Sequence, residues 1–296
     1  MGIVIICYAY NRHPQSIYNY HHSDNALTSL EIKDKSPIGQ FDPTIDKYGR
    51  RLNVPDPPKG NQDTQLVFDG LGLPVVANNT KSQILYRKGY VVSYNSDYRL
   101  PNWVMWKLTE NHTDGIIKRP TNAWHEDSEV PCPRATLYDY RSSGWSRGHM
   151  CPAGDNKWDK NAMYDTFLLS NCCPQNANLN SGVWNEIEIA CRRWAKRFNS
   201  IYIICGPIML RTEHQKIGIN KVTVPDAFFK VVLCTGEKPK GIGFVCRNTD
   251  GQRKKDKYIN SIKQIERITG MSFFPNLRND IAAIVKDNCN LNQWDY

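Results

Sequence analysis

Arg147, Gly148 and His149 are consecutive in the sequence, and together they could handle a phosphodiester. A neutral histidine can take a proton from water at physiological pH, because its unperturbed pKa lies near neutrality. Arginine is always charged and presents a planar fork of donors that matches phosphate oxygens. On an extended strand the two side chains project from the same face, and the glycine between them lets a bulky substrate approach. Alone, the triplet is a weak signal, because such a pair on an ordinary strand usually carries no chemistry.

Further polar residues follow this triplet over the next forty positions. They are grouped as Pro152-Ala153-Gly154-Asp155, Ser170-Asn171, Pro174-Gln175, Asn180-Ser181-Gly182-Val183-Trp184 and Glu188. Segment 183–198 has apolar residues at steps of three and four, which predicts an amphipathic helix. Glu188 and Arg192 are neighbours on that helix, and a plain intrahelical ion pair is one interpretation of them.

This order and spacing resemble the signature of the DNA/RNA non-specific endonucleases, the ββα-metal nucleases. That signature reads Asp-Arg-Gly-His, Pro-Ala-x-Asp, Ser-Asn or Thr-Asn, Pro-Gln, and Asn-x-Gly-x-Trp with a glutamate four residues beyond the tryptophan. The chain departs from it at Ser146, where the family has aspartate. The resemblance covers about Phe68 to the C-terminus. It implies an α+β fold with a mixed or antiparallel central sheet, flanking helices and a ββα-metal active-site motif.

The resemblance also implies a metal-dependent reaction. His149 would be the general base, and Asn180 would bind one Mg²⁺ or another divalent cation such as Mn²⁺. Magnesium keeps most of its waters and takes few protein ligands, so one amide oxygen is a plausible protein contribution. Glu188 would hold a metal-bound water. The ion would stabilise charge on the phosphate and the leaving 3′ oxygen, which yields 5′-phosphate ends.

The remaining implied site residues are Asn171, Arg147 and Arg192. Asn171 would hydrogen-bond near the base and orient the site, whereas the two arginines would contact phosphate. Arg119, Arg134 and Arg141 are upstream candidates for further phosphate contacts, with solvated surface charge as the alternative. Contacts to phosphates and metal rather than base edges predict little sequence preference, and the family acts on both DNA and RNA.

The formal charge of +9 and the pI near 9.0 suit a polyanionic partner, although many basic proteins bind no nucleic acid. The function predicted is therefore a sugar-non-specific endonuclease. A serine has shorter reach than aspartate and no charge, so a weakened or inactive homologue that only binds nucleic acid is the first alternative. A toxin-like partner protein that uses its basic face is another. Metal-dependent strand scission separates these readings.

The ten cysteines show no Cys-x-x-Cys pair and no zinc-site spacing, which favours buried thiols or one or two disulfides. The adjacent Cys172 and Cys173 would point oppositely on a strand and are poor joint metal ligands. The apolar run 2–7 is too short to span a bilayer, and no later stretch predicts a transmembrane helix. Cysteine content and the family's secreted bacterial members predict a secreted or periplasmic protein, and a homodimer is one possible assembly.

Residues 1–62 are largely polar and interrupted by prolines, which predicts an N-terminal extension that ends in a linker. The alternative is that this segment packs as extra strands on the main domain. Residues 63–296 are predicted to form one endonuclease domain. Its strands are expected near 65–68, 73–76, 84–86, 90–94, 101–108, 200–208, 222–233 and 241–245, with a second helix over 262–269.

Overall fold

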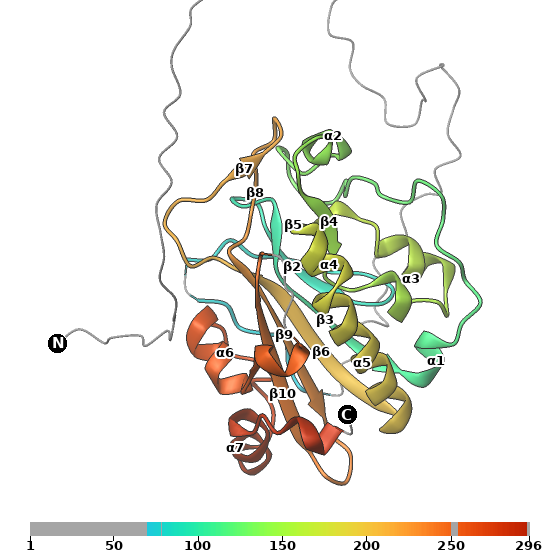
Figure 1. Ribbon diagram of the computed structural model, residues 1–296, viewed down its shortest axis with the longest axis vertical. Helices are drawn as coiled ribbons and strands as arrows, with labels where there is room; N and C mark the ends of the chain where they lie inside the picture. Colours follow the sequence, from blue (N-terminus) through green and yellow to red (C-terminus); the bar gives the residue numbers. More distant parts are fainter. Residues whose placement is uncertain (1–69, 78, 250–253, 295–296) are drawn as a thin grey trace, which may run out of the picture. The chain divides into compact units, whose positions relative to one another are not determined.

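A seven-stranded sheet forms the centre of the domain, in the order β1-β2-β3-β6-β9-β10-β11 (Figure 1). The computed structural model describes residues 70–77, 79–249 and 254–294. All six neighbouring pairs of strands in this sheet run antiparallel. The fold is therefore the predicted α+β class, and the sheet is antiparallel rather than mixed.

The strands and helices have the following bounds. The central sheet consists of β1 (Gln83–Tyr86), β2 (Val91–Asn95), β3 (Leu100–Thr109), β6 (Ser200–Ile208), β9 (Ala227–Cys234), β10 (Lys240–Arg247) and β11 (Ile259–Asn260). Two smaller sheets pair β4 (Ser146–His149) with β5 (Cys172–Gln175) and β7 (Lys216–Ile217) with β8 (Val222–Thr223). The helices are α1 (Glu110–Thr113), α2 (Leu137–Tyr140), α3 (Lys160–Asp165), α4 (Ala177–Ser181), α5 (Val183–Arg197), α6 (Ile262–Thr269) and α7 (Asn279–Asp287).

Each face of the sheet packs against its own apolar layer. On one face the stripe of α5, which includes Trp184, Ile187 and Trp194, is buried against the sheet. On the other face α6 and α7 bury Ile265 and Val285. Because both faces are covered, the central strands β3, β6 and β9 are buried along nearly their whole length.

Most predicted elements are confirmed, with two differences. The predicted strand 222–233 is split into β8 and β9, because Pro225 lacks the N–H that a ladder needs. Segment 73–76 contributes only an isolated bridge between Val75 and Ser272. The strand expected at 65–68 and the extension at 1–62 lie outside the described residues, so the domain boundary at residue 62 stays a prediction.

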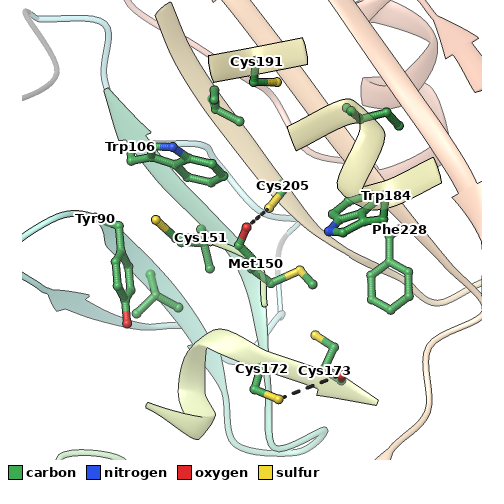
Figure 2. Packing of buried hydrophobic residues seen from close by; sticks show 14 of the residues in the cluster. Tyr90, Trp106, Met150, Cys151, Cys172, Cys173, Trp184, Cys191, Cys205 and Phe228 are labelled. Atoms are coloured by element: carbon green, nitrogen blue, oxygen red, sulfur yellow. Dashed lines mark hydrogen bonds between the residues drawn. The ribbon is translucent and has the colours of Figure 1, made fainter. Parts of the chain in front are cut away.

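Nine cysteines fall within the described residues, and all nine are free thiols. Seven of them are buried, which agrees with the buried-thiol interpretation and not with disulfides in this part of the chain. Figure 2 shows Cys205 near Met150 in the core, with Trp106 and Trp184 on either side. No helix in the described ranges is long and apolar enough to cross a membrane.

Candidate active site

The two-stranded β4–β5 ladder holds His149 in place. His149 lies opposite Cys172, and Gly148 lies opposite Cys173. A Cβ atom on Gly148 would collide with the side chain of Gln175, so this position accepts only glycine without rearrangement. Together with α4 and α5, which follow directly in the chain, β4 and β5 form the ββα arrangement that the motif predicted.

Asn171 fastens the end of β4 to the core. Its Oδ1 accepts a hydrogen bond from the Cys151 amide at 2.9 Å, and its Nδ2 donates to the carbonyls of Cys151 at 2.9 Å and Thr166 at 2.8 Å. Its own carbonyl accepts from the Met150 amide at 2.9 Å. The side chain is fully buried and fully used, so Asn171 holds the residues next to His149 rather than facing the substrate.

His149 lies between two aromatic rings. Its imidazole is 4.3 Å from the Trp124 ring and 5.1 Å from the Phe167 ring, measured between centroids. Its Nε2 atom is buried and has no hydrogen-bond partner. Burial, followed by the positive charges of Arg119 and Arg147, lowers the pKa of His149 to about 3. The histidine is therefore neutral at physiological pH, with one ring nitrogen uncommitted.

A cleft of about 640 Å³ opens beside His149. Its lining includes three arginines and, within the described residues, no carboxylate; the residues are Arg119, Trp124, Leu137, Tyr140, Arg141, Trp145, Ser146, Arg147, His149 and Asn180. The guanidinium of Arg119 lies 4.9 Å from the Phe167 ring and that of Arg147 5.6 Å from the Trp124 ring. The rings that flank the histidine therefore also position two cations.

Of the three upstream arginines, the structure brings two to the cleft. Arg119 and Arg141 line it, whereas Arg134 forms an ion pair with Glu126 at 3.2 Å. Arg134 is thus a structural charge. The sequence alone could not show which of the three arginines reaches the cleft. The segment that carries them has little regular structure and therefore no periodicity from which the direction of a side chain could be predicted.

Asn180 lies on the short helix α4, whose N-cap Asn176 accepts hydrogen bonds from the amides of Asn178 and Leu179. The half-buried side chain of Asn180 lines the cleft and makes no hydrogen bond to another described residue. An uncommitted amide oxygen facing a polar cleft fits a hard cation such as Mg²⁺. Across the described ranges, no group of three or more His, Cys, Asp or Glu side chains is placed to hold a metal.

Glu188 and Arg192 belong to a charged group that also contains Asp155. Arg192 Nη1 donates to Asp155 Oδ1 at 3.0 Å, and Trp106 Nε1 donates to Asp155 Oδ2 at 3.1 Å. Arg192 thus pairs with the aspartate of the Pro152–Asp155 motif, and the intrahelical pair with Glu188 is not formed. Neither Glu188 nor Arg192 is among the lining residues of the cleft.

Lys230, which the sequence did not single out, also belongs to this charged group. It is 1% exposed, and its Nζ lies 4.5 Å from the Trp184 ring and 5.3 Å from the Trp106 ring. Burial raises the pKa of Glu188 to about 7, with the charge of Lys230 opposing that rise and Asp155 adding to it. A lysine within the apolar run of β9 was the available signal, because lysine is rarely fully buried without a compensating charge or ring.

Trp124 was also missed, and no feature of the sequence marks it. It lies outside the helices and strands, yet it is buried and contacts both His149 and Arg147. The structure therefore brings His149, Arg147 and Asn180 together at the cleft. Asn171, Glu188 and Arg192 are not among the lining residues, and Asn171 is buried in the core next to β4.

At pH values above 7, replacing Glu188 with glutamine is expected to raise the melting temperature. The folded-state pKa of Glu188 is about 7, above its ordinary value of 4.5, so the folded protein binds this proton more readily and loses stability as pH rises through that window. Glutamine mimics the protonated form at every pH. Thermal unfolding from pH 4 to pH 8 should show Glu188→Gln melting above the unmodified protein at pH 8 and close to it at pH 4.

The matched control is Glu186→Gln on the exposed surface of the same helix. It should shift the melting temperature little at either pH, because exposed charges contribute little to stability. An equal shift in both variants, or no gain for Glu188→Gln at pH 8, would show that burial of Glu188 carries no energetic cost.

Comparison with known proteins places the chain among nucleases. The family model described as DNA/RNA non-specific endonuclease matches residues 72–280. The chain is 35% identical over 225 residues to a Xenopus laevis protein, "Nuclease EXOG, mitochondrial", with 71% of this chain and 62% of that protein covered. It is 35% identical over 220 residues to human "Endonuclease G, mitochondrial", with 70% and 72% covered. The chain thus spans less than two thirds of the length of the Xenopus relative.

A solved structure supports the same relationship. The match is to EndoG in its complex with EndoGI, with a TM-score of 0.65 and 27% sequence identity over 70% of this chain and 92% of that one. The neighbour has the ββα-metal fold, which confirms the fold expected from the motif.

The predicted secreted or periplasmic location is wrong. Vertebrate relatives from frog, mouse, fish, cattle and human carry the word mitochondrial in their names. The prediction depended on the family's bacterial members and on cysteine content, neither of which is specific to a compartment.

Three observations agree on the family: the motifs in the sequence, the ββα arrangement around His149, and the family match over residues 72–280. The family consists of divalent-metal-dependent nucleases, which act on nucleic acids. This chain belongs to the DNA/RNA non-specific endonuclease family.

Proposed function

We propose that this protein is a metal-dependent endonuclease that hydrolyses both DNA and RNA and leaves 5′-phosphate ends. The observation that carries the proposal is the neutral His149, with a buried and unpartnered Nε2, in a cleft lined by three arginines and by Asn180. A base that is neutral at working pH and an anion-binding wall are two of the requirements for phosphodiester hydrolysis.

His149 would take a proton from the attacking water. The imidazole is neutral and makes no hydrogen bond to a described residue, and Trp124 and Phe167 limit the ring's movement. A phosphate bound by Arg119 and Arg147 would offset the positive charges that lower the pKa of His149, which would make the imidazole a stronger base. Arg147 and Arg119 would bind the phosphate oxygens, since each guanidinium is held over a ring with its donors available. Because these groups recognise phosphate rather than base edges, we propose that DNA and RNA are both substrates.

Asn180 would hold the divalent cation through its side-chain oxygen, with Mg²⁺ as the proposed ion and Mn²⁺ as a substitute. When bound, the ion would stabilise negative charge on the phosphate and on the leaving oxygen. Glu188 would accept a hydrogen bond from the ion's hydration water. Arg192 would reach phosphate only if it left Asp155, so we propose that it mainly holds that carboxylate in place.

We propose a mitochondrial location, because several relatives that match most of this chain are named as mitochondrial nucleases. The proposal is checked by expressing the full-length protein with a C-terminal fluorescent tag and scoring overlap with a mitochondrial dye. A diffuse or secreted signal would contradict it.

The function is tested with supercoiled plasmid and, separately, single-stranded RNA, each with magnesium or EDTA. Cutting of both substrates with magnesium and not with EDTA is expected. Asn180→Ala should need much more magnesium, whereas Asn178→Ala, an exposed asparagine on the same helix, should behave like the unmodified protein. Binding without cutting under any divalent ion would reject the nuclease proposal.

The second candidate is a protein that binds nucleic acid without cutting it, and Ser146 favours it. Ser146 lines the cleft where the family signature has aspartate, and none of the described residues that line the cleft carries a carboxylate. Opposite Ser146, Gln175 is fully buried with neither amide atom hydrogen-bonded. Because three arginines and no carboxylate are among its described lining residues, the cleft has a surplus of positive charge. That charge would bind phosphate but weaken the binding of a cation.

Restoring the carboxylate with Ser146→Asp is expected to lower the magnesium concentration for half-maximal cleavage about fivefold. One added charge near a bound cation contributes about 1 kcal/mol in a solvent-exposed setting. The same change should weaken nucleic-acid binding in EDTA, because it removes net positive charge from the cleft. Magnesium titrations of cleavage and fluorescence anisotropy in EDTA measure the two effects.

Ser146→Asn is the control, since it has the shape of aspartate without its charge. If asparagine and aspartate shift the magnesium requirement equally, size rather than charge matters at this position. If neither changes it, Ser146 does not weaken the cation site.

A further inference from the structure

Helix α2 presents an aromatic side chain at the edge of the cleft. A capping box between Thr136 and Asp139 fixes this four-residue helix. Leu137, Tyr140 and Arg141 line the cleft, whereas Tyr138 is not a lining residue and is 66% exposed. The Arg141 guanidinium lies 5.4 Å from the Tyr138 ring. Arg141 therefore lines the cleft and also lies over an exposed aromatic ring.

The tip of the β7–β8 hairpin is fastened to this helix. Buried Asp139 accepts hydrogen bonds from the backbone amide of Asn220 at 3.0 Å and from its Nδ2 at 2.9 Å. Gly218 has a φ of +65°, and a Cβ atom there would collide with Asp139, so only glycine allows this approach. Figure 1 shows α2 and the hairpin side by side. These contacts hold the tip of the hairpin against α2, the helix that carries Tyr138.

The side chains at that tip suit a strand of nucleic acid. Ile219 is 88% exposed, and Lys216 and Lys221 on the same hairpin are exposed as well. α2 carries an exposed ring with a cation over it, and the hairpin bonded to α2 carries an exposed apolar side chain and two lysines. Together they offer stacking surface and phosphate attraction. The three arginines of the cleft continue into this surface through Arg141.

We propose that α2 and the tip of β7–β8 form an extended binding surface for the substrate strand where it leaves the cleft, with Tyr138 stacking on a nucleobase. The occupant is nucleic acid and not a protein, because no carboxylate is among the described lining residues of the cleft that this surface continues, and the exposed charged groups of α2, Arg141 and the hairpin are basic. This inference rests on the proposed function, since it extends the same site. It predicts that affinity depends on substrate length.

The test compares Tyr138→Ala with the unmodified full-length protein on labelled single strands of increasing length, at one fixed salt concentration. On strands long enough to pass α2, Tyr138→Ala should raise KM about 5- to 100-fold, the effect of losing one base–aromatic stack, with kcat unchanged. On the shortest strands that are still cut, the two proteins should have the same KM. Tyr138→Phe should restore the unmodified values, because phenylalanine keeps the ring.

Ile284→Ala removes a side chain that is 58% exposed on α7, against the other face of the sheet, and serves as the control. It should change neither KM nor its dependence on length. A KM for Tyr138→Ala that equals the unmodified value at every length would overturn the inference, as would a loss that is the same at every length.

The test of this binding surface can fail independently of the test of nuclease activity. Cleavage by the unmodified protein tests the nuclease, and the dependence of KM on length tests the surface. If nothing is cut, fluorescence anisotropy with the same strands still decides. Tighter binding of long strands that is lost in Tyr138→Ala and kept in Tyr138→Phe supports the surface, and equal binding by all variants rejects it.

Discussion

His149→Ala is expected to slow cleavage of plasmid and RNA about 10²- to 10⁴-fold, the range for losing a general base. The imidazole is neutral because burial and the charges of Arg119 and Arg147 lower its pKa to about 3, and no described residue holds either ring nitrogen in a hydrogen bond. Single-turnover rates at saturating protein measure the chemical step separately from binding. Nucleic-acid affinity in EDTA should change little, because the three arginines remain.

The comparison variant is His125→Ala, a histidine whose Nδ1 is hydrogen-bonded at 2.7 Å to the Ala123 carbonyl and whose ring stacks on Tyr164. Its pKa is also lowered by burial, yet it does not line the cleft. If both variants lose activity equally, the effect on His149 reflects disturbed packing. If neither does, His149 is not the base.

His149→Ala should also alter the dependence of the unfolding free energy on pH. The folded-state pKa of His149 is about 3, below its ordinary 6.5, so the unfolded chain binds this proton first. The stability linked to His149 is complete above pH 6.5 and is lost as pH falls towards 3. The difference in unfolding free energy between the unmodified protein and His149→Ala should therefore shrink as pH falls through this window, as urea denaturation at several pH values would show.

Asn171→Leu is expected to destabilise the fold by about 3–5 kcal/mol. Leucine has nearly the same size but leaves the Cys151 amide and the carbonyls of Cys151 and Thr166 buried without partners, at about 1–3 kcal/mol each with incomplete additivity. The melting temperature should fall by about 2–4 °C per kcal/mol. Activity should fall too, because these bonds hold the residues that follow His149.

Asn178→Leu, on the exposed surface of α4, should leave the melting temperature nearly unchanged. An Asn171→Leu protein that melts normally but cleaves poorly would show that Asn171 acts on the substrate directly. One that melts early yet retains full activity would show that the end of β4 is held by other contacts, such as the Cys205 Sγ to Met150 carbonyl hydrogen bond of 3.2 Å.

Local patterns in the sequence determined much of this protein. The spacing of Trp184, Ile187 and Trp194 predicted α5, because a helix brings every third and fourth residue to one face. Runs of β-branched and aromatic residues predicted β3 and β6, which the structure confirms. The order of short motifs from Arg147 to Glu188 identified the family, since each motif is contiguous and needs no knowledge of tertiary contacts.

Only the tertiary structure decided which side chains meet. Arg192 pairs with Asp155 and not with Glu188, although helical spacing made Glu188 its neighbour on α5. Trp124, in a segment without regular structure, contacts His149, and Lys230 lies between the rings of Trp106 and Trp184. Such contacts join segments far apart in the chain, and periodicity describes only how a segment orients its own side chains. The pKa of the base and the lining of the cleft follow from those contacts.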